Sequence, residues 1–237
     1  MRVSGRIAGA GWCNLALLLV AITVGTWVIY ESQRLMRADL LAVGTRKQVG
    51  NWASGAAEPT SQLDWDDALA TLTAAQTITP DNPGLQEAIG DLHMVAGRRV
   101  WADMPLRLRH FGLAAAQYRA ALNLRPADPQ TWASLAAAYQ GAGDTGSKLH
   151  QAWAKALALG PNEGHVQPML LETALATWAV ATPQMQAWAQ AFFAASADPQ
   201  RKAINQMAQR YGLRFDLDQP ALPGAAGSAQ ARSRGSP

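Results

Sequence analysis

Apolar and polar positions along most of this chain recur with the period of an α-helix, and no stretch alternates convincingly with the period of a β-strand. In the clearest stretch, large apolar residues recur where neighbouring helical hairpins pack, and small residues recur where two helices approach closely. The residues at these packing and turn positions are Ala114, Tyr118, Ala121, Pro126, Trp132, Leu135, Ala136, Tyr139, Trp153 and Pro161. Their order and spacing predict stacked pairs of helices.

The spacing is that of the tetratricopeptide repeat (TPR), a helix–turn–helix unit of about 34 residues. A weaker copy in phase with the first begins at Pro83 and places His93 at an aromatic packing position. A single hairpin of this size cannot bury its apolar face alone, so such repeats must stack. We therefore expect an all-α fold containing a TPR-like α-solenoid of helical hairpins.

The first hairpin is longer than the repeat requires. Pro80 and Pro126 lie 46 residues apart, whereas Pro126 and Pro161 lie 35 residues apart. We expect the additional residues to lengthen both helices of this hairpin, with Asp103 capping the second helix and Pro105 opening it.

Residues with a side-chain acceptor mark the starts of several helices. Thr60 or Ser61 is expected to cap the first helix of the repeat domain. Four further caps, each followed by a proline suited to the first helical position, are Asn82, Asp128, Thr182 and Asp198.

An apolar segment near the N-terminus predicts a membrane anchor. Residues 8–30 carry no formal charge, and about 20 apolar residues in a helix span a hydrocarbon core of about 30 Å. Trp27 and Tyr30 stand near its end, where amphipathic rings favour the membrane–water interface. A cleaved signal peptide is the alternative, but the bulky residues 27–31 do not suit a small-residue cleavage site. We expect a single transmembrane helix.

These features divide the chain into four parts. Residues 1–31 form a short tail and the transmembrane anchor, and residues 32–60 form a juxtamembrane helix with a linker over residues 50–59. Residues 61–215 form the TPR-like helical repeat domain. Residues 216–237, rich in Pro, Gly, Ala and Ser, form a tail that we expect to be disordered.

The basic net charge of +3 does not indicate a nucleic-acid partner. Four of the 20 Lys and Arg residues lie near the ends of the chain, at positions 2, 6, 232 and 234, while all 17 acidic residues lie between Glu31 and Asp218. The folded part is therefore nearly neutral, whereas nucleic-acid binders concentrate basic charge there. The only cysteine, Cys13, permits neither an internal disulfide nor a cysteine metal site.

No pattern of residues indicates catalysis. The four histidines are separate from one another along the chain, and the aspartates Asp64, Asp66 and Asp67 suit a helix start, where negative charge is favourable. We expect no catalytic residue, no metal and no cofactor.

Two sets of residues are candidates for binding a partner. Arg98, Arg99, Arg107 and Arg109 belong to the lengthened hairpin, where they form either a solvated tip or a contact for an anionic partner. Gln130 and Gln140 occupy positions that face the groove of tetratricopeptide repeats. Their small neighbours favour packing against a protein helix over capture of a charged tail.

The order of these features resembles one bacterial family, the VpsP-like proteins associated with exopolysaccharide biosynthesis. The resemblance covers residues 8 to 215, and its most discriminating part is Gly160-Pro161-x-Glu163-x-x-Val166-Gln167. The other matching segments are residues 118–122, 125–126, 131–136, 156–159, 175–178 and 208–212.

The resemblance implies a non-enzymatic adaptor in the bacterial inner membrane, whose partners are polysaccharide synthesis or export components and not nucleic acid. Lys and Arg residues flank the anchor almost equally, but the short N-terminal tail favours a periplasmic repeat domain. Two alternatives stay open: an adaptor of another envelope assembly, such as cytochrome c maturation or secretion, and an enzyme acting on glycans.

Overall fold

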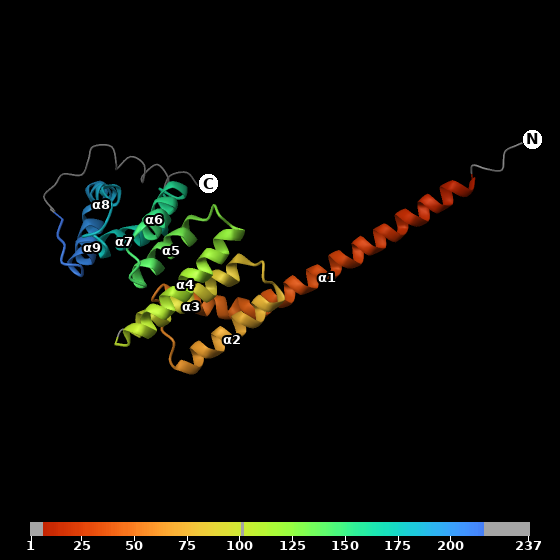
Figure 1. Cartoon of the computed structure of the whole chain (residues 1–237), viewed down its shortest axis with the longest axis horizontal. Coiled ribbons are helices and arrows are strands. Elements are labelled where there is room, and N and C mark those ends of the chain that lie inside the picture. The colour runs from red at the N-terminus through yellow and green to blue at the C-terminus, as the bar shows by residue number, and fades with distance from the viewer. Residues whose placement is uncertain (1–6, 101, 216–237) are drawn as a thin grey trace, which may run out of the picture. The chain divides into compact units, whose positions relative to one another are not determined.

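The computed structural model describes the backbone of residues 7–100 and 102–215 and the side chains of residues 17–100 and 102–215. Every regular element in these residues is an α-helix, which confirms the all-α expectation (Figure 1). The tail expected to be disordered, residues 216–237, lies outside the described residues. The helices are α1 (Ile7–Ala53), α2 (Gln62–Ile78), α3 (Pro83–Arg99), α4 (Met104–Leu124), α5 (Pro129–Gly141), α6 (Ser147–Leu159), α7 (Val166–Ala176), α8 (Pro183–Ala195) and α9 (Asp198–Gln209).

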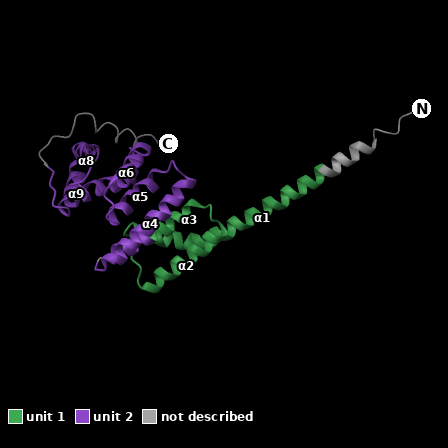
Figure 2. Ribbon diagram, viewed as in Figure 1, with its two compact units in different colours: residues 1–92 green, residues 93–237 purple. Residues whose placement is uncertain are grey.

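The chain divides into two compact units, residues 1–92 and residues 93–237, and the boundary between them along the chain falls within α3 (Figure 2). The sequence places the start of the repeat domain at residue 61. In the structure, the second half of α1 lies in the same unit as α2, because the two helices pack against each other.

The first unit depends on a stripe of small and large residues along the second half of α1. Ala38, Ala42, Val49 and Trp52 are buried and Thr45 is half-buried, so the stripe advances by alternating steps of four and three residues. This spacing keeps one face of a helix against a neighbouring helix. The buried residues of α2 repeat the same steps at Ala68, Leu72 and Ala75.

The linker expected over residues 50–59 is shorter in the structure, because α1 continues to Ala53. Burial of Val49 and Trp52 outweighs the low helix propensity of Gly50, a penalty of about 1 kcal/mol. The chain then turns through Gly55 at φ +76°. Of the two expected caps, Ser61 begins α2 in a capping box with Asp64.

Within the described residues, no helix has a stretch that is both long and apolar enough to cross a membrane. The expected anchor covers residues 8–30, and the side chains of residues 8–16 lie outside the described part. Residues 17–30 continue without a break into the half of α1 that packs on α2.

The lengthened hairpin has the expected form. Helices α3 and α4 contain 17 and 21 residues, whereas α5 and α6 contain 13 each. The Asp103 carboxylate accepts a hydrogen bond from the Leu106 amide at 3.0 Å, and proline follows within the first two helical positions. The extra residues therefore lengthen both helices, as predicted.

In the second unit, α5 packs against α4, α6 and α7. Tyr118 and Trp153 are each 1% exposed, which confirms their expected burial. The Trp153 indole donates a hydrogen bond to the Leu170 carbonyl at 2.9 Å and meets Trp188 edge to face, with ring centroids 5.5 Å apart. One large side chain thus links α6, α7 and α8.

Two glycines allow the Phe111 ring of α4 to approach α3 and α5 closely. A Cβ atom added to Gly97 would lie 3.0 Å from the ring, and one added to Gly141 would lie 2.5 Å from it. The second distance is shorter than any ordinary contact between carbon atoms. Phe111 therefore fills space that any other residue at position 141 would need.

The expected helix caps are present at three of the four proline-marked starts. Asn82 accepts from the Gly84 amide, Asp128 from the Thr131 amide and Thr182 from the Met185 amide. The prediction for Asp198 is wrong, because α9 begins one residue earlier than expected and Ala197 occupies the cap position. Asp198 instead lies in the first turn, where its charge remains favourable near the helix N-terminus.

We predict that Gly141→Ala destabilises the protein by about 1–3 kcal/mol, the usual cost of overpacking a core, because the new methyl group overlaps the Phe111 ring. Gly112→Ala in α4 is the matched control, since a Cβ atom there meets nothing within 4 Å. It should stabilise the protein by about 0.5–1 kcal/mol through helix propensity. Urea unfolding followed by circular dichroism measures both, and equal effects of the two variants would contradict the close packing of Phe111.

Candidate functional site

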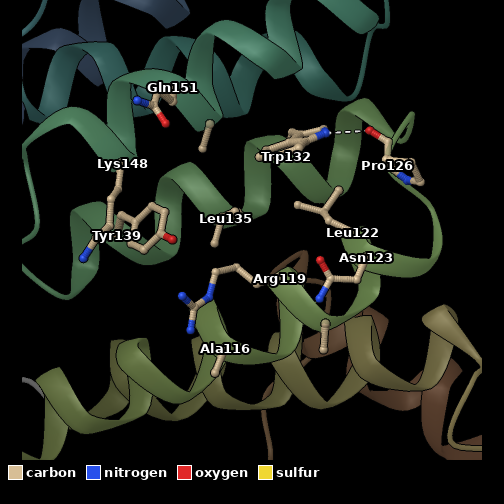
Figure 3. A pocket seen from close by; sticks show the side chains of 12 residues that line it. Ala116, Arg119, Leu122, Asn123, Pro126, Trp132, Leu135, Tyr139, Lys148 and Gln151 are labelled. Carbon is tan, nitrogen blue, oxygen red and sulfur yellow. Dashed lines mark hydrogen bonds between the residues drawn. The ribbon is translucent and has the colours of Figure 1, made fainter.

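A groove of about 630 Å³ lies on the second unit, lined by residues of α4, α5 and α6 and of the turn between α4 and α5 (Figure 3). Its volume falls within the range of ligand pockets, which is about 300–1,000 Å³. The groove is therefore the candidate functional site.

The floor of the groove is a stripe on α5. Trp132, Leu135 and Tyr139 follow each other at intervals of three and four residues, so they lie on one face of the helix. The Trp132 indole donates a hydrogen bond to the Pro126 carbonyl at 2.8 Å, which fixes the ring at one end (Figure 3). The floor is thus mainly apolar, with an aromatic ring towards each end.

The walls of the groove are helices α4 and α6, where polar side chains stand among alanines. Arg119 and Asn123 come from α4, one turn apart, and Lys148 and Gln151 come from α6. Lys148 forms an ion pair with Asp144, with Nζ and Oδ2 3.1 Å apart. Among the described residues, the side chains of Arg119, Asn123 and Gln151 form no hydrogen bond, so their donors and acceptors are available to a ligand.

The arginines proposed from the sequence do not line this groove. Arg98 and Arg99 end α3 and are exposed, and Arg109 is exposed near the start of α4. Arg107 is half-buried, with its guanidinium carbon 5.7 Å from the centroid of the Phe111 ring. Part of this cluster therefore packs on the core as well as facing solvent.

The two glutamines also lie apart from the groove lining. Gln130 is exposed in the first turn of α5, and Gln140 is half-buried in its last turn. The groove does not follow from the sequence pattern, because the pattern assigns Trp132, Leu135 and Tyr139 wholly to the core. The sequence signal that marks the groove is the helical spacing of polar residues on the two flanking helices. Arg119 and Asn123 lie four residues apart on α4, and Lys148 and Gln151 lie three residues apart on α6.

The other predicted repeat positions divide into core and turn. Pro126 and Pro161 are exposed beyond the ends of α4 and α6. The buried members are Ala114, Tyr118, Ala121, Leu135, Ala136 and Trp153.

Two histidines that are separate along the chain meet in the structure. His93 lies six residues before the end of α3 and His110 six residues after the start of α4, so the turn of the hairpin places them opposite each other. Their Nδ1 atoms are 3.2 Å apart. The sequence expectation of isolated histidines is therefore wrong for this pair. Within the described residues, no three His, Cys, Asp or Glu side chains gather as a metal site would require.

Burial keeps both rings uncharged near neutral pH. The pKa of His93 is lowered to about 4, chiefly because burial desolvates the ring, and repulsion from a protonated His110 and from Arg109 contributes to the same shift. Burial also lowers the pKa of His110, again assisted by Arg109. In the neutral pair one Nδ1 donates and the other accepts, whereas two protonated rings would place two donors against each other.

We predict that acid destabilises the second unit through His93. The unfolded chain takes up the proton near pH 6.5 and the folded chain only near pH 4, so stability falls as the pH drops through this window and levels off below it. His93→Phe should remove this part of the pH dependence. Urea midpoints at pH 7 and pH 5.2 measure the effect, because most carboxylates stay ionised across that interval.

Gly112→Ala is the control for that experiment, since it removes no titratable group and its methyl group meets nothing within 4 Å. It should retain the pH dependence of the wild-type protein. A wild-type midpoint that is constant between the two pH values would contradict the burial of an uncharged His93.

No protein-family model matches the chain, and no curated protein matches it either. These two comparisons therefore assign the chain to no family.

Proposed function

We propose that the protein is a non-enzymatic adaptor that is anchored in a membrane by the first part of α1 and binds other proteins through TPR-like helical hairpins. The observation that carries this proposal is the exposed apolar surface of residues 17–30. It is supported by the packing of the hairpins in the second unit.

Residues 17–30 are apolar on every side of the helix. Leu17, Leu18, Leu19 and Val20 are consecutive, so together they cover more than one full turn, and each is 56–67% exposed. A helix that is apolar all round is stable only when it is buried, in a large core or in a bilayer. The described part of the first unit supplies no such core, because α2 packs on the half of α1 beyond residue 37.

The ends of this stretch suit a membrane. Trp27 and Tyr30 are exposed, and the first polar turn follows at once with an ion pair between Glu31 and Arg34, 2.6 Å apart. Residues 8–30 in helical form would be about 35 Å long, enough for a hydrocarbon core of about 30 Å. The lipid would bury the apolar surface that α1 leaves open.

The packing in the second unit favours a solenoid. Helix α5 contacts α4 and α6, its neighbours in the chain, and also α7, the first helix of the next hairpin. Contact between the first helices of successive hairpins is what stacked repeats require. Such stacks present continuous surfaces to other proteins, which suits an adaptor.

The assignment to a bacterial exopolysaccharide system rests on the resemblance of the sequence alone. On that basis the anchor lies in the inner membrane and the repeats lie in the periplasm, next to polysaccharide synthesis or export components. Affinity purification from native membranes, with a tag at the C-terminus, should recover such components. Recovery of cytochrome c maturation or secretion components in their place would assign the adaptor to that assembly instead.

We predict that replacing Val20 and Val24 with arginine releases the protein from membranes. Each arginine near the centre of a transmembrane helix costs about 2.5–3.5 kcal/mol. The wild-type chain should stay in the membrane pellet after carbonate extraction, and the double variant should move to the supernatant.

The matched control is Met36→Arg with Leu40→Arg, which adds the same charges to exposed apolar positions of α1 beyond the anchor. This variant should remain in the pellet. The anchor would be refuted by a wild-type chain that carbonate extracts, or by a Val20/Val24 variant that stays in the pellet with the control.

A further inference from the structure

We propose that the groove between α4, α5 and α6 binds an extended peptide segment of a partner protein in which apolar and acidic residues alternate. The inference rests on the proposed adaptor function and assigns its binding site. This site is separate from the glutamine positions expected from the repeat pattern.

The floor of the groove fixes the spacing of apolar side chains in the ligand. Trp132 and Tyr139 are seven residues apart on α5, a distance of about 10 Å along the helix, with Leu135 between them. An extended peptide advances about 3.3 Å per residue and points alternate side chains to one face. Two or three apolar residues in alternate positions therefore match the length of the floor.

The walls select for negative charge between those apolar residues. Among the described residues that line the groove, the charged ones are Arg119 on α4 and Lys148 on α6, and both are cationic. Lys148 is partly neutralised by Asp144, whereas Arg119 pairs with no described carboxylate. Because no described carboxylate occupies the planar guanidinium of Arg119, it can bind a ligand carboxylate with two parallel hydrogen bonds.

The uncharged wall residues suit a peptide backbone. Asn123 and Gln151 each offer an amide donor and an amide acceptor, and neither side chain is engaged within the described residues. An extended peptide has the same pair of groups at every residue that is not proline. The alanines of the walls, Ala116 and Ala120 on α4 and Ala152 on α6, leave room for that backbone to approach.

The test uses the full chain in detergent and two synthetic peptides with a fluorescent label. The probe is acetyl-Leu-Glu-Leu-Glu-Leu-amide, and its matched control, acetyl-Leu-Gln-Leu-Gln-Leu-amide, has the same length and apolar residues without charge. Fluorescence anisotropy should show binding of the acidic probe at least tenfold tighter than binding of the control. The affinity should fall as the salt concentration rises, because the charged side chains of Arg119 and Lys148 are exposed to solvent.

Three variants locate the site. Arg119→Gln should weaken the acidic probe about tenfold, the effect of losing one charge-assisted contact. Ala116→Trp should abolish binding by filling the groove while both cations remain. Lys155→Glu removes a cation from an exposed position of α6 outside the groove and should leave the affinity unchanged within twofold.

Several results would overturn the proposal. These are equal binding of the two peptides, full affinity in Ala116→Trp, and an equal loss in Lys155→Glu and Arg119→Gln. Binding of polygalacturonate or of anionic vesicles, without binding of the acidic peptide, would assign the groove to a different ligand and also overturn it. Membrane fractionation is independent of these variants, so failure of the groove and failure of the anchor can be told apart.

Discussion

The arrangement of the second unit depends on how closely the Phe111 ring approaches Gly97 and Gly141. The ring occupies the space in which a side chain at either glycine would stand, and at Gly141 the overlap would be severe. Because α4 carries Phe111 and α5 ends at Gly141, this contact sets the separation of the two helices. It therefore also sets the distance between the α4 wall and the α5 floor of the groove.

Alanine serves two purposes in these hairpins. Where helices face one another, Ala114, Ala136 and Ala156 are fully buried and permit close packing. Where α4 faces outward, Ala116 and Ala120 leave space beside the larger side chains of α5. A composition selected for tight stacking thus also produces a groove, and the longer polar residues around it supply the chemistry.

Local features of the fold could be predicted from the sequence because they depend on neighbouring residues. The cap at Asp103, the longer hairpin, and the burial of Tyr118 and Trp153 follow from spacing and side-chain chemistry. The end of α1 could not be predicted, since the burial of Val49 and Trp52 overrides Gly50, which would otherwise favour a break.

The candidate site could not be predicted from the sequence, because it depends on how separate helices pack against one another. Helical period assigns a residue to a face, but it does not reveal whether a neighbouring helix covers that face completely. The helical period places Tyr139 in the core, whereas the structure places it half-exposed on the groove floor. The meeting of His93 and His110 likewise depends on which residues of two helices lie opposite each other across the turn.

The unbroken course of α1 has a mechanical consequence for the first unit. The same helix carries the exposed apolar residues 17–30 and the buried stripe that starts at Ala38, with no turn or glycine-rich joint between them. A helix of this kind acts as a stiff lever: Ala53 lies about 35 Å beyond Tyr30, so a tilt of about 10° moves it sideways by about 6 Å. Rotation of residues 17–30 about the helix axis would turn α2 by the same angle. The orientation of the apolar end therefore fixes the orientation of α2.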